Sequence, residues 1–308
     1  HTTSFSGTAG WLASIDDFYV TSGADGTTAS TASATASATT IATTTKGGTS
    51  LAIIETSNSI YNKTLYDLLT PKTNLCWVRS LVANRLATTG QEWADAFSAH
   101  HSGTYNNQWM VLDLNLYPGS SGKLASKSSA RPEEKTEEKT EEKTEEKTTA
   151  GGAAAGGAAA AAGLLTILEE IPGYIETKDM TAYFLNTTYW PSFNVPFFAD
   201  VRARSGYPAD AWDAAPRNCI FRQLHSTIDD LATMQTVMQW NKFSNESAAM
   251  AACTNGDPML EIMSRGDLRA VPAAFGALDT KISRCVYVCP QLFALSLSRS
   301  LSRSPCVC

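Results

Sequence analysis

The feature that most restricts the fold is a stretch in which apolar and polar residues alternate directly after a turn. Residues 100–117 read HHSGTYNNQWMVLDLNLY. From Met110 onward the even positions are apolar, while the odd positions carry Val111 and then Asp113, so the two sets point to opposite faces of a β-strand. We predict a strand over 108–117, and we expect the amides at its polar end to have hydrogen-bond partners.

Four further segments show the periodicity of regular secondary structure. Residues 14–22 and 51–58 have strand composition, and we predict that they form a hairpin. Residues 75–87 have apolar residues at helical spacing, and residues 88–100 place a Trp and a Phe four positions apart behind a threonine N-cap. We therefore predict two helices after the first two strands.

The remaining pattern decides the predicted fold class. We predict one more strand over 164–175 that pairs with 108–117, while residues 176–283 mix short helical signals with proline-broken loops. Strands and helices do not alternate regularly. The sequence therefore predicts an α+β fold with antiparallel strands and not a doubly wound fold.

Two low-complexity inserts interrupt this pattern. Residues 24–50 are rich in Thr, Ala and Ser, and residues 118–163 contain four copies of EEKT and an Ala/Gly tract. A repeat of four residues places like charges at positions i and i+4 of a helix, which disfavours a helix there. We predict solvated linkers in one domain over 1–283, followed by an unrelated, disordered tail over 284–308.

The composition excludes several classes of function. The net charge is −6, and Lys and Arg do not form a stripe with interleaved aromatic residues, which argues against a nucleic-acid partner. The chain has no run of 18 or more apolar residues, so we expect no transmembrane segment. The glycine-rich signatures of nucleotide sites are absent, and we expect no cofactor.

The cysteines and the glycosylation sequons carry weaker signals. Of seven cysteines, four lie in the last 24 residues, where a Ser/Arg/Leu repeat lacks the turn residues that hold zinc ligands in place. We expect no metal site. Sequons at Asn62, Asn186 and Asn245 permit N-linked glycosylation.

Two polar residues stand in apolar surroundings. Asn194 lies between Pro191 and Pro196 in YWPSFNVPFF, residues 189–198, which is a rigid frame for one amide. Arg222 follows an Ile-Phe pair in RNCIFRQ. A buried amide or guanidinium is costly unless it is hydrogen-bonded, so we expect both side chains to be buried with partners. Such residues taken singly are more often structural than catalytic.

Two adjacent titratable pairs are interpreted as structural. His100 and His101 follow a predicted helix end, and Asp16 and Asp17 lie in a predicted strand, where successive side chains diverge. We expect the histidines to interact with the helix C-terminus and the aspartates to form strand-end hydrogen bonds.

A series of eight blocks occurs in a fixed order along the chain. The blocks are SFSGTAGWLASIDDFYVTS, LAIIETSNSIYN, TTGQEWADAFSAHHSGTYNNQWMVLDL, LEEIPGYIETKDMT, YWPSFNVPFF, IFRQ, MSRGDL and AFGALDTKIS. Together they resemble the phospholipase B-like family of the N-terminal nucleophile hydrolase superfamily. The resemblance implies a four-layer αββα sandwich of antiparallel sheets, incomplete in this chain.

The resemblance also implies a chemistry. Members are expected to cleave themselves, expose an N-terminal cysteine and hydrolyse acyl ester or amide bonds of lipids. In that family pattern Asn194 is the oxyanion donor, Arg222 orients the nucleophile and lowers its pKa, and Thr56 is a hydrogen-bonding residue at a strand end. The HTT at the start of the chain is similar to the family's HTTW block, which makes His1 a fourth candidate. The resemblance also implies that GTYNNQW lies where strand ends border the catalytic cleft, with its amides bound to loop backbone.

The departures from the family pattern set the remaining expectations. The nucleophile cysteine is expected upstream of His1, and none of the seven cysteines matches its motif, so we expect an inactive fragment that also lacks the family C-terminus. The implied partner is a lipid or amide small molecule, and the implied location is lysosomal or extracellular. The alternative is a non-catalytic secreted binding glycoprotein on the same fold.

Overall fold

The computed structural model describes residues 2–5, 7, 10–14, 18–23, 49–117, 162–242, 252–274, 276–277 and 280–285. Most of the two predicted inserts and of the predicted tail lie outside these residues. The candidate His1, the sequon at Asn245 and the Asp16–Asp17 pair also lie outside them.

A six-stranded antiparallel sheet in the order β1-β2-β3-β4-β5-β6 forms the centre of the described structure. The predicted hairpin is confirmed as β2–β3, and the predicted pairing across the second insert is confirmed as β4–β5. The strands are β1 (Thr2–Phe5), β2 (Phe18–Ser22), β3 (Ser50–Ser57), β4 (Asn107–Asp113), β5 (Leu165–Ile171) and β6 (Tyr174–Asp179).

The single strand predicted over 164–175 is wrong. The chain reverses at Pro172 and Gly173 and returns as β6. Gly173 has φ +74°, a backbone conformation that glycine adopts without steric cost. The Pro-Gly pair is therefore a hairpin turn inside what the sequence presents as one apolar run.

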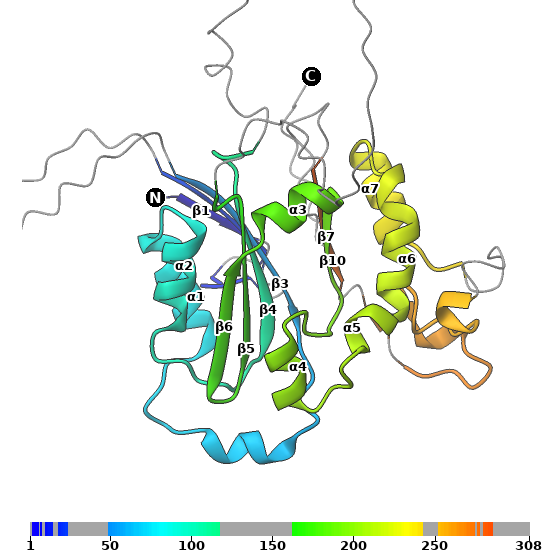
Figure 1. Cartoon of the computed structure of the whole chain (residues 1–308), viewed down its shortest axis with the longest axis horizontal. Coiled ribbons are helices and arrows are strands. Elements are labelled where there is room, and N and C mark those ends of the chain that lie inside the picture. The colour runs from blue at the N-terminus through cyan, green and yellow to red at the C-terminus, as the bar shows by residue number, and fades with distance from the viewer. Residues whose placement is uncertain are drawn as a thin grey trace, which may run out of the picture.

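Helices and a two-stranded sheet of β7 and β10, the β7–β10 ribbon, cover the two faces of this main sheet (Figure 1). α1 and α2 lie on one face, while α3, α4 and the β7–β10 ribbon lie on the other, with α6 and α7 beyond the ribbon. The predicted α+β class is confirmed. These elements are η1 (Lys63–Leu68), α1 (Cys76–Leu86), α2 (Gly90–Ser98), α3 (Thr181–Thr187), β7 (Tyr189–Ser192), α4 (Ala199–Ser205), α5 (Ala211–Ala214), α6 (Pro216–Leu224), η2 (His225–Thr227), α7 (Leu231–Met238), β8 (Ser264–Arg265), η3 (Gly266–Leu268), β9 (Gly276–Ala277) and β10 (Lys281–Arg284).

The hydrophobic core has one cluster on each face of the sheet and a third around α5 to α7. Between the sheet and α2, Trp93 stacks on Phe97 at a centroid distance of 4.7 Å, and both rings contact Trp109 of β4. On the opposite face, Met110 and Leu112 of β4 join the second cluster. All seven residues of β4 are buried, so the central strand separates two apolar layers.

Helix α1 turns an unexpected face to the core. The helix itself was predicted, but its apolar stripe points outward: Leu75 at its N-cap is 54% exposed and Leu86 is 67% exposed. Buried positions include Cys76, Arg79 and Ala83. The reason is a buried ion pair between Arg79 and Glu170 of β5, which lies under this helix.

A disulfide that the sequence did not predict joins Cys219 of α6 to Cys253. The two cysteines are 34 residues apart in the chain. The bond lies in the third cluster, where Cys253 and the partly buried Cys219 both pack.

Candidate functional site

The candidate site is the loop that follows β7, with Asn194 at its centre. Asn194 has φ +70°, the left-handed region in which asparagine is enriched among non-glycine residues. Pro191 and Pro196 restrict the backbone on either side. The predicted rigid frame is therefore present, and Asn194 is its strained point.

Asn194 is fixed through both its backbone and its amide. Its Nδ2 donates to the carbonyl of Ser57 at 2.9 Å, and its Oδ1 accepts from Arg217 Nη1 at 2.9 Å. Its backbone N–H donates to Thr56 Oγ1 at 3.3 Å, and its carbonyl accepts from the Tyr207 hydroxyl at 2.8 Å. The structure thus brings together two of the predicted residues, Asn194 and Thr56.

Thr56 also connects β3 to the β7–β10 ribbon. Its Oγ1 lies 2.6 Å from Oγ of Ser192, the last residue of β7, and both side chains are buried. The ends of two strands from different sheets therefore meet at this pair of hydroxyls.

The guanidinium at the site belongs to Arg217 and not to Arg222. Besides the Asn194 amide, Arg217 donates to the carbonyls of Glu261 at 3.0 Å and Met259 at 3.3 Å. The side chain of Arg222 is 56% exposed and lies 3.8 Å from Asp213, so the expectation that it is buried is wrong. Its catalytic role stays a prediction.

Three buried polar side chains form a row across the sheet beneath this loop. Thr56 of β3 is opposite Gln108 of β4 in the strand register, and Gln108 is opposite Glu169 of β5. Each is at most 1% exposed. Because opposite residues of neighbouring strands project from the same face, all three side chains point toward the Asn194 loop.

This polar row holds both ends of the loop. Gln108 Oε1 accepts from the indole N–H of Trp190 at 3.2 Å, and its Nε2 donates to Glu169 Oε1 at 2.5 Å. Glu169 accepts from the backbone N–H of Phe197 at 2.5 Å and of Phe198 at 3.0 Å. The amide of Gln108 therefore links the indole of Trp190 to the carboxyl group of Glu169, so it binds two side chains where loop backbone was expected.

The carboxyl group of Glu169 is fully buried. Burial raises its pKa to about 7, against the opposing effect of the hydrogen bonds from Gln108, Phe197 and Phe198. The negative charge of Glu176, which is opposite Glu169 on β6, acts in the same direction as burial.

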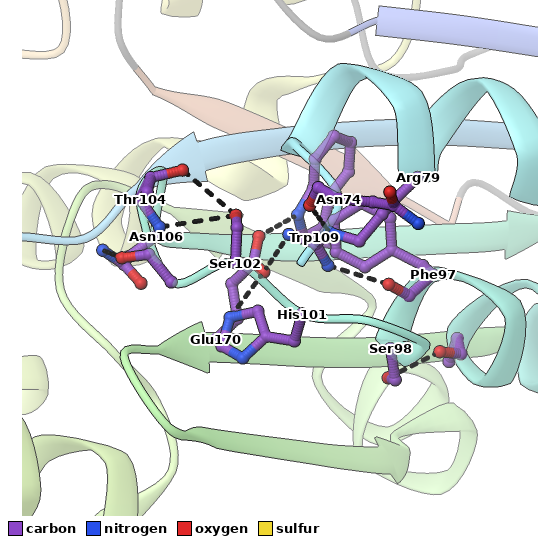
Figure 2. A network of polar contacts seen from close by, with 12 residues as sticks. Asn74, Arg79, Phe97, Ser98, His101, Ser102, Thr104, Asn106, Trp109 and Glu170 are labelled. Carbon is purple, nitrogen blue, oxygen red and sulfur yellow. Dashed lines mark hydrogen bonds and ion pairs between the residues drawn. The ribbon is translucent and has the colours of Figure 1, made fainter. Parts of the chain in front are cut away.

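The next residue, Glu170, projects from the other face and has a different environment (Figure 2). It accepts from Arg79 Nη2 at 2.8 Å and from Trp109 Nε1 at 3.1 Å, and His101 Nε2 lies 3.1 Å from it. His101 therefore contacts a buried carboxylate, where the sequence interpretation expected only a helix C-terminus. This network fastens α1 and the turn before β4 to the sheet.

A small hollow of about 280 Å³ opens beside Asn194. The polar groups on its wall are Ser59, Asn194, Tyr207 and Arg217, and the apolar side chains include Phe193 and Leu260. The ring of Tyr61 completes the wall and packs edge-on against Tyr207. A carbonyl group with an apolar substituent matches these surroundings.

The side chains of this cluster can donate hydrogen bonds to a ligand. Among the described residues, no group of three or more His, Cys, Asp or Glu is placed to hold a metal ion. The described cysteines are the disulfide pair and the buried Cys76 and Cys285, which pack in the clusters on the two faces of the sheet. An immobilised amide backed by a guanidinium can stabilise an oxyanion.

The two described sequons differ in accessibility. Asn186 is exposed on α3. The side chain of Asn62 caps η1, and its Nδ2 donates to the carbonyl of Arg204 at 3.1 Å. Glycosylation at all three sequons stays a prediction.

The sequence interpretation missed Arg217, Gln108 and Glu169. For Arg217 the sequence signals only that Pro216 marks the first turn of a helix, which does not determine the side of the helix that faces the loop. Gln108 and Glu169 become meaningful only in the strand register, which the sequence alone does not give.

Comparison with known proteins gives a consistent result. A family model described as Phospholipase B matches residues 1–294. The chain is 33% identical over 304 residues to Phospholipase B-like 1 of Rattus norvegicus, and 32% identical over 304 residues to Phospholipase B-like 1 of Homo sapiens. It is 31% identical over 297 residues to Phospholipase B-like protein A of Dictyostelium discoideum.

These alignments differ in how much of each protein they include. They cover 96%, 96% and 91% of this chain, but 42%, 42% and 40% of the three relatives, in the same order. The chain thus spans about two fifths of the length of the curated relatives it matches. In the part of the chain that is described, no helix has the length and apolar character that a bilayer crossing requires.

Proposed function

The chain belongs to the phospholipase B family, and from that premise we propose that it forms part of a hydrolase that cleaves acyl ester or amide bonds in lipids. The observation that carries the proposal is the convergence of Thr56, Asn194 and Arg217 from three separate elements. Rigid donors of this kind suit a reaction in which negative charge develops on a carbonyl oxygen.

In the proposed mechanism, the Asn194 amide stabilises the oxyanion of the tetrahedral intermediate through its second N–H, while the first stays bound to the carbonyl of Ser57. Arg217 binds the amide oxygen, so the nitrogen is directed away from it, and the positive charge polarises the amide. Thr56 holds the backbone of Asn194 in place. These groups are already positioned before the substrate arrives, so little reorganisation is needed during the reaction.

The nucleophile in this proposal is a cysteine thiol that the α-amino group of the same residue deprotonates. We propose that it lies in a part of the family's length that this sequence does not span. A four-layer sandwich is the corresponding proposed architecture: in Figure 1, α1 and α2, the main sheet, the β7–β10 ribbon and the α6–α7 pair follow one another as layers.

The proposed substrate is a lipid with an acyl ester or amide bond, and the proposed location is lysosomal or extracellular. The hollow beside Asn194 supports an acyl carbonyl with an apolar substituent. The Cys219–Cys253 disulfide supports an oxidising compartment, because such bonds persist mainly in secreted and lumenal proteins.

The test is hydrolysis by protein expressed from the complete coding region. Phosphatidylcholine in mixed micelles and an N-acyl amide are incubated with the enzyme, and released fatty acid is measured. We expect Asn194→Ala to lower kcat by about 10²–10³-fold with a smaller effect on KM, because the lost bond forms fully only in the transition state.

Two arginine variants test the assignment of the guanidinium. We expect Arg217→Lys to lower kcat, because a lysine cannot reach the amide and both carbonyls at once, whereas Arg222→Lys keeps activity. If Arg222→Lys lowered kcat and Arg217→Lys did not, the catalytic guanidinium would be that of Arg222. A complete protein that releases no fatty acid from either substrate would instead support the non-catalytic binding glycoprotein.

A further inference from the structure

The Asn194 loop is attached to the polar row of Thr56, Gln108 and Glu169 at three points. Gln108 binds Trp190 of β7 just before the loop, Thr56 binds Ser192 at the end of β7 and the Asn194 N–H within the loop, and Glu169 binds the N–H groups of Phe197 and Phe198 at the end of the loop. Of the three supporting side chains, only Glu169 can gain a proton in the ordinary pH range.

We propose that Glu169 is a proton-controlled positioning residue for Asn194, whose ionised carboxylate holds the end of the loop and whose protonation loosens it. The proposal rests on the proposed role of Asn194 as oxyanion donor. Glu169 is at the sheet and acts only through the loop, so it is not a catalytic residue.

The geometry explains why one proton matters. The two oxygens of Glu169 accept three N–H groups, two at Oε1 and one at Oε2. A protonated carboxyl group turns one oxygen from an acceptor into a donor, which then faces N–H groups that also donate. At least one of the three bonds must therefore lengthen or break, and the bonds that remain, including those to Phe197 and Phe198, lose the strengthening from charge.

The surrounding charges leave Glu169 without a fixed counter-ion. Among the described residues, the hydrogen bonds to Glu169 come from uncharged amide groups. Lys178 of β6 lies 2.5 Å from Glu176 and over the ring of Phe198. The titratable and charged groups around it are Glu176 and Lys178 on β6, Asp200 and Arg202 on α4, and Tyr207, whose own pKa is raised chiefly by burial.

The pKa of Glu169 supports the same conclusion. Burial raises it to about 7, so the carboxyl group changes its charge between a neutral and a mildly acidic medium. Gln108 keeps its bond to Trp190, and Thr56 keeps its bonds to Ser192 and to the Asn194 N–H, because none of these groups titrates in this range. The start and middle of the loop should therefore stay attached while its end is released.

The experiment is an NMR titration of the 308-residue chain labelled with ¹⁵N in Phe, Trp and Asn. The N–H signals of Phe197 and Phe198 and the side-chain NH₂ signal of Asn194 are followed from pH 5 to pH 8. We expect them to move together in one step with a common midpoint, while the Trp190 indole signal moves less. Hydrolysis is not read, so an inactive chain does not affect the result.

Two variants identify the group that titrates. Glu169→Gln should lose the step in all three signals. Glu176→Gln, the matched control on the opposing strand, should keep the step and shift its midpoint to lower pH, because it removes a neighbouring negative charge. If Glu169→Gln does not fold, the wild type and Glu176→Gln decide the question.

Three outcomes would overturn the proposal. In the first, the Asn194 signal does not change with pH although the Phe197 and Phe198 signals do. In the second, the titration step is still present in Glu169→Gln. In the third, the midpoint of the step is not lower in Glu176→Gln than in the wild type. Its failure is separate from that of the proposed function: the step can occur in a protein without hydrolase activity, and hydrolysis can occur without the step.

Discussion

Raising the pH from 4.5 to 7.5 should destabilise this protein through Glu169, and Glu169→Gln should remove that contribution. The carboxyl group of Glu169 in β5 is fully buried. The solvation free energy that its ionised form loses there exceeds the stabilisation from the three N–H groups that bind it. In the unfolded chain the same group is in water and ionises at its ordinary pKa. The two states therefore differ in bound protons over this range.

The magnitude follows from the two pKa values. Between the ordinary value of 4.5 and the folded value of about 7, the native state keeps a proton that the unfolded state has released. The free energy of unfolding is then highest, with respect to this group, below pH 4.5, falls as the pH rises and is constant above 7. A tenfold change in proton concentration corresponds to 1.36 kcal/mol, so the loss is about 3 kcal/mol.

The assay is urea unfolding of wild type and Glu169→Gln at several pH values between 4.5 and 7.5. The quantity to compare is the difference between the two proteins, because other groups contribute equally to both; burial also raises the pKa of Asp113, for example. Glu176→Gln serves as the control and should keep most of the wild-type slope. Parallel pH profiles for wild type and Glu169→Gln would refute the reasoning.

Three other changes should have distinct effects on stability. Glu170→Gln leaves the guanidinium of Arg79 buried without its carboxylate and should cost about 3–5 kcal/mol in urea unfolding; a loss under 1 kcal/mol would show that water reaches the pair. Cys219→Ser removes a disulfide between cysteines 34 residues apart and should lower the free energy of unfolding by about 2–4 kcal/mol. Reduction of the wild type should shift the urea midpoint by the same amount as the substitution. Unequal shifts would contradict an effect of the bond alone. Gly90→Ala places a Cβ 2.4 Å from Thr166 Oγ1 and should lower the free energy of unfolding by about 1–3 kcal/mol. A second change of Thr166 to Ser should not restore this loss, whereas a change of Thr166 to Gly should. An unchanged Tm of Gly90→Ala would refute the close contact.

The parts of the fold that were predictable carry local, uninterrupted signals. In α2 the hydroxyl of Thr89 accepts from the N–H of Glu92, and the rings of Trp93 and Phe97 stack as their spacing predicts. For α1 the spacing predicts a helix but not which side is buried. That choice depends on Glu170, which is 91 residues from Arg79 in the chain.

The site was predictable only in part for the same reason. Asn194 and Thr56 were named from the family resemblance, and the structure brings them together. Arg217 and Arg222 lie on the same helix, and five residues correspond to a rotation of about 140° around its axis, so only one can face the loop. Neither local composition nor spacing states which one, because the answer depends on how α6 packs against the rest of the chain.

The row of Thr56, Gln108 and Glu169 also protects the protein against misassembly. A slip of β5 by one residue would turn every side chain of that strand to the opposite face. Glu169 would then be forced among Trp93, Phe97 and the other rings under α2, and Glu170 would lose its arginine. Two successive glutamates that each suit a different side of the sheet therefore make the mispaired arrangement costly and help to select a single alignment of the strands during folding.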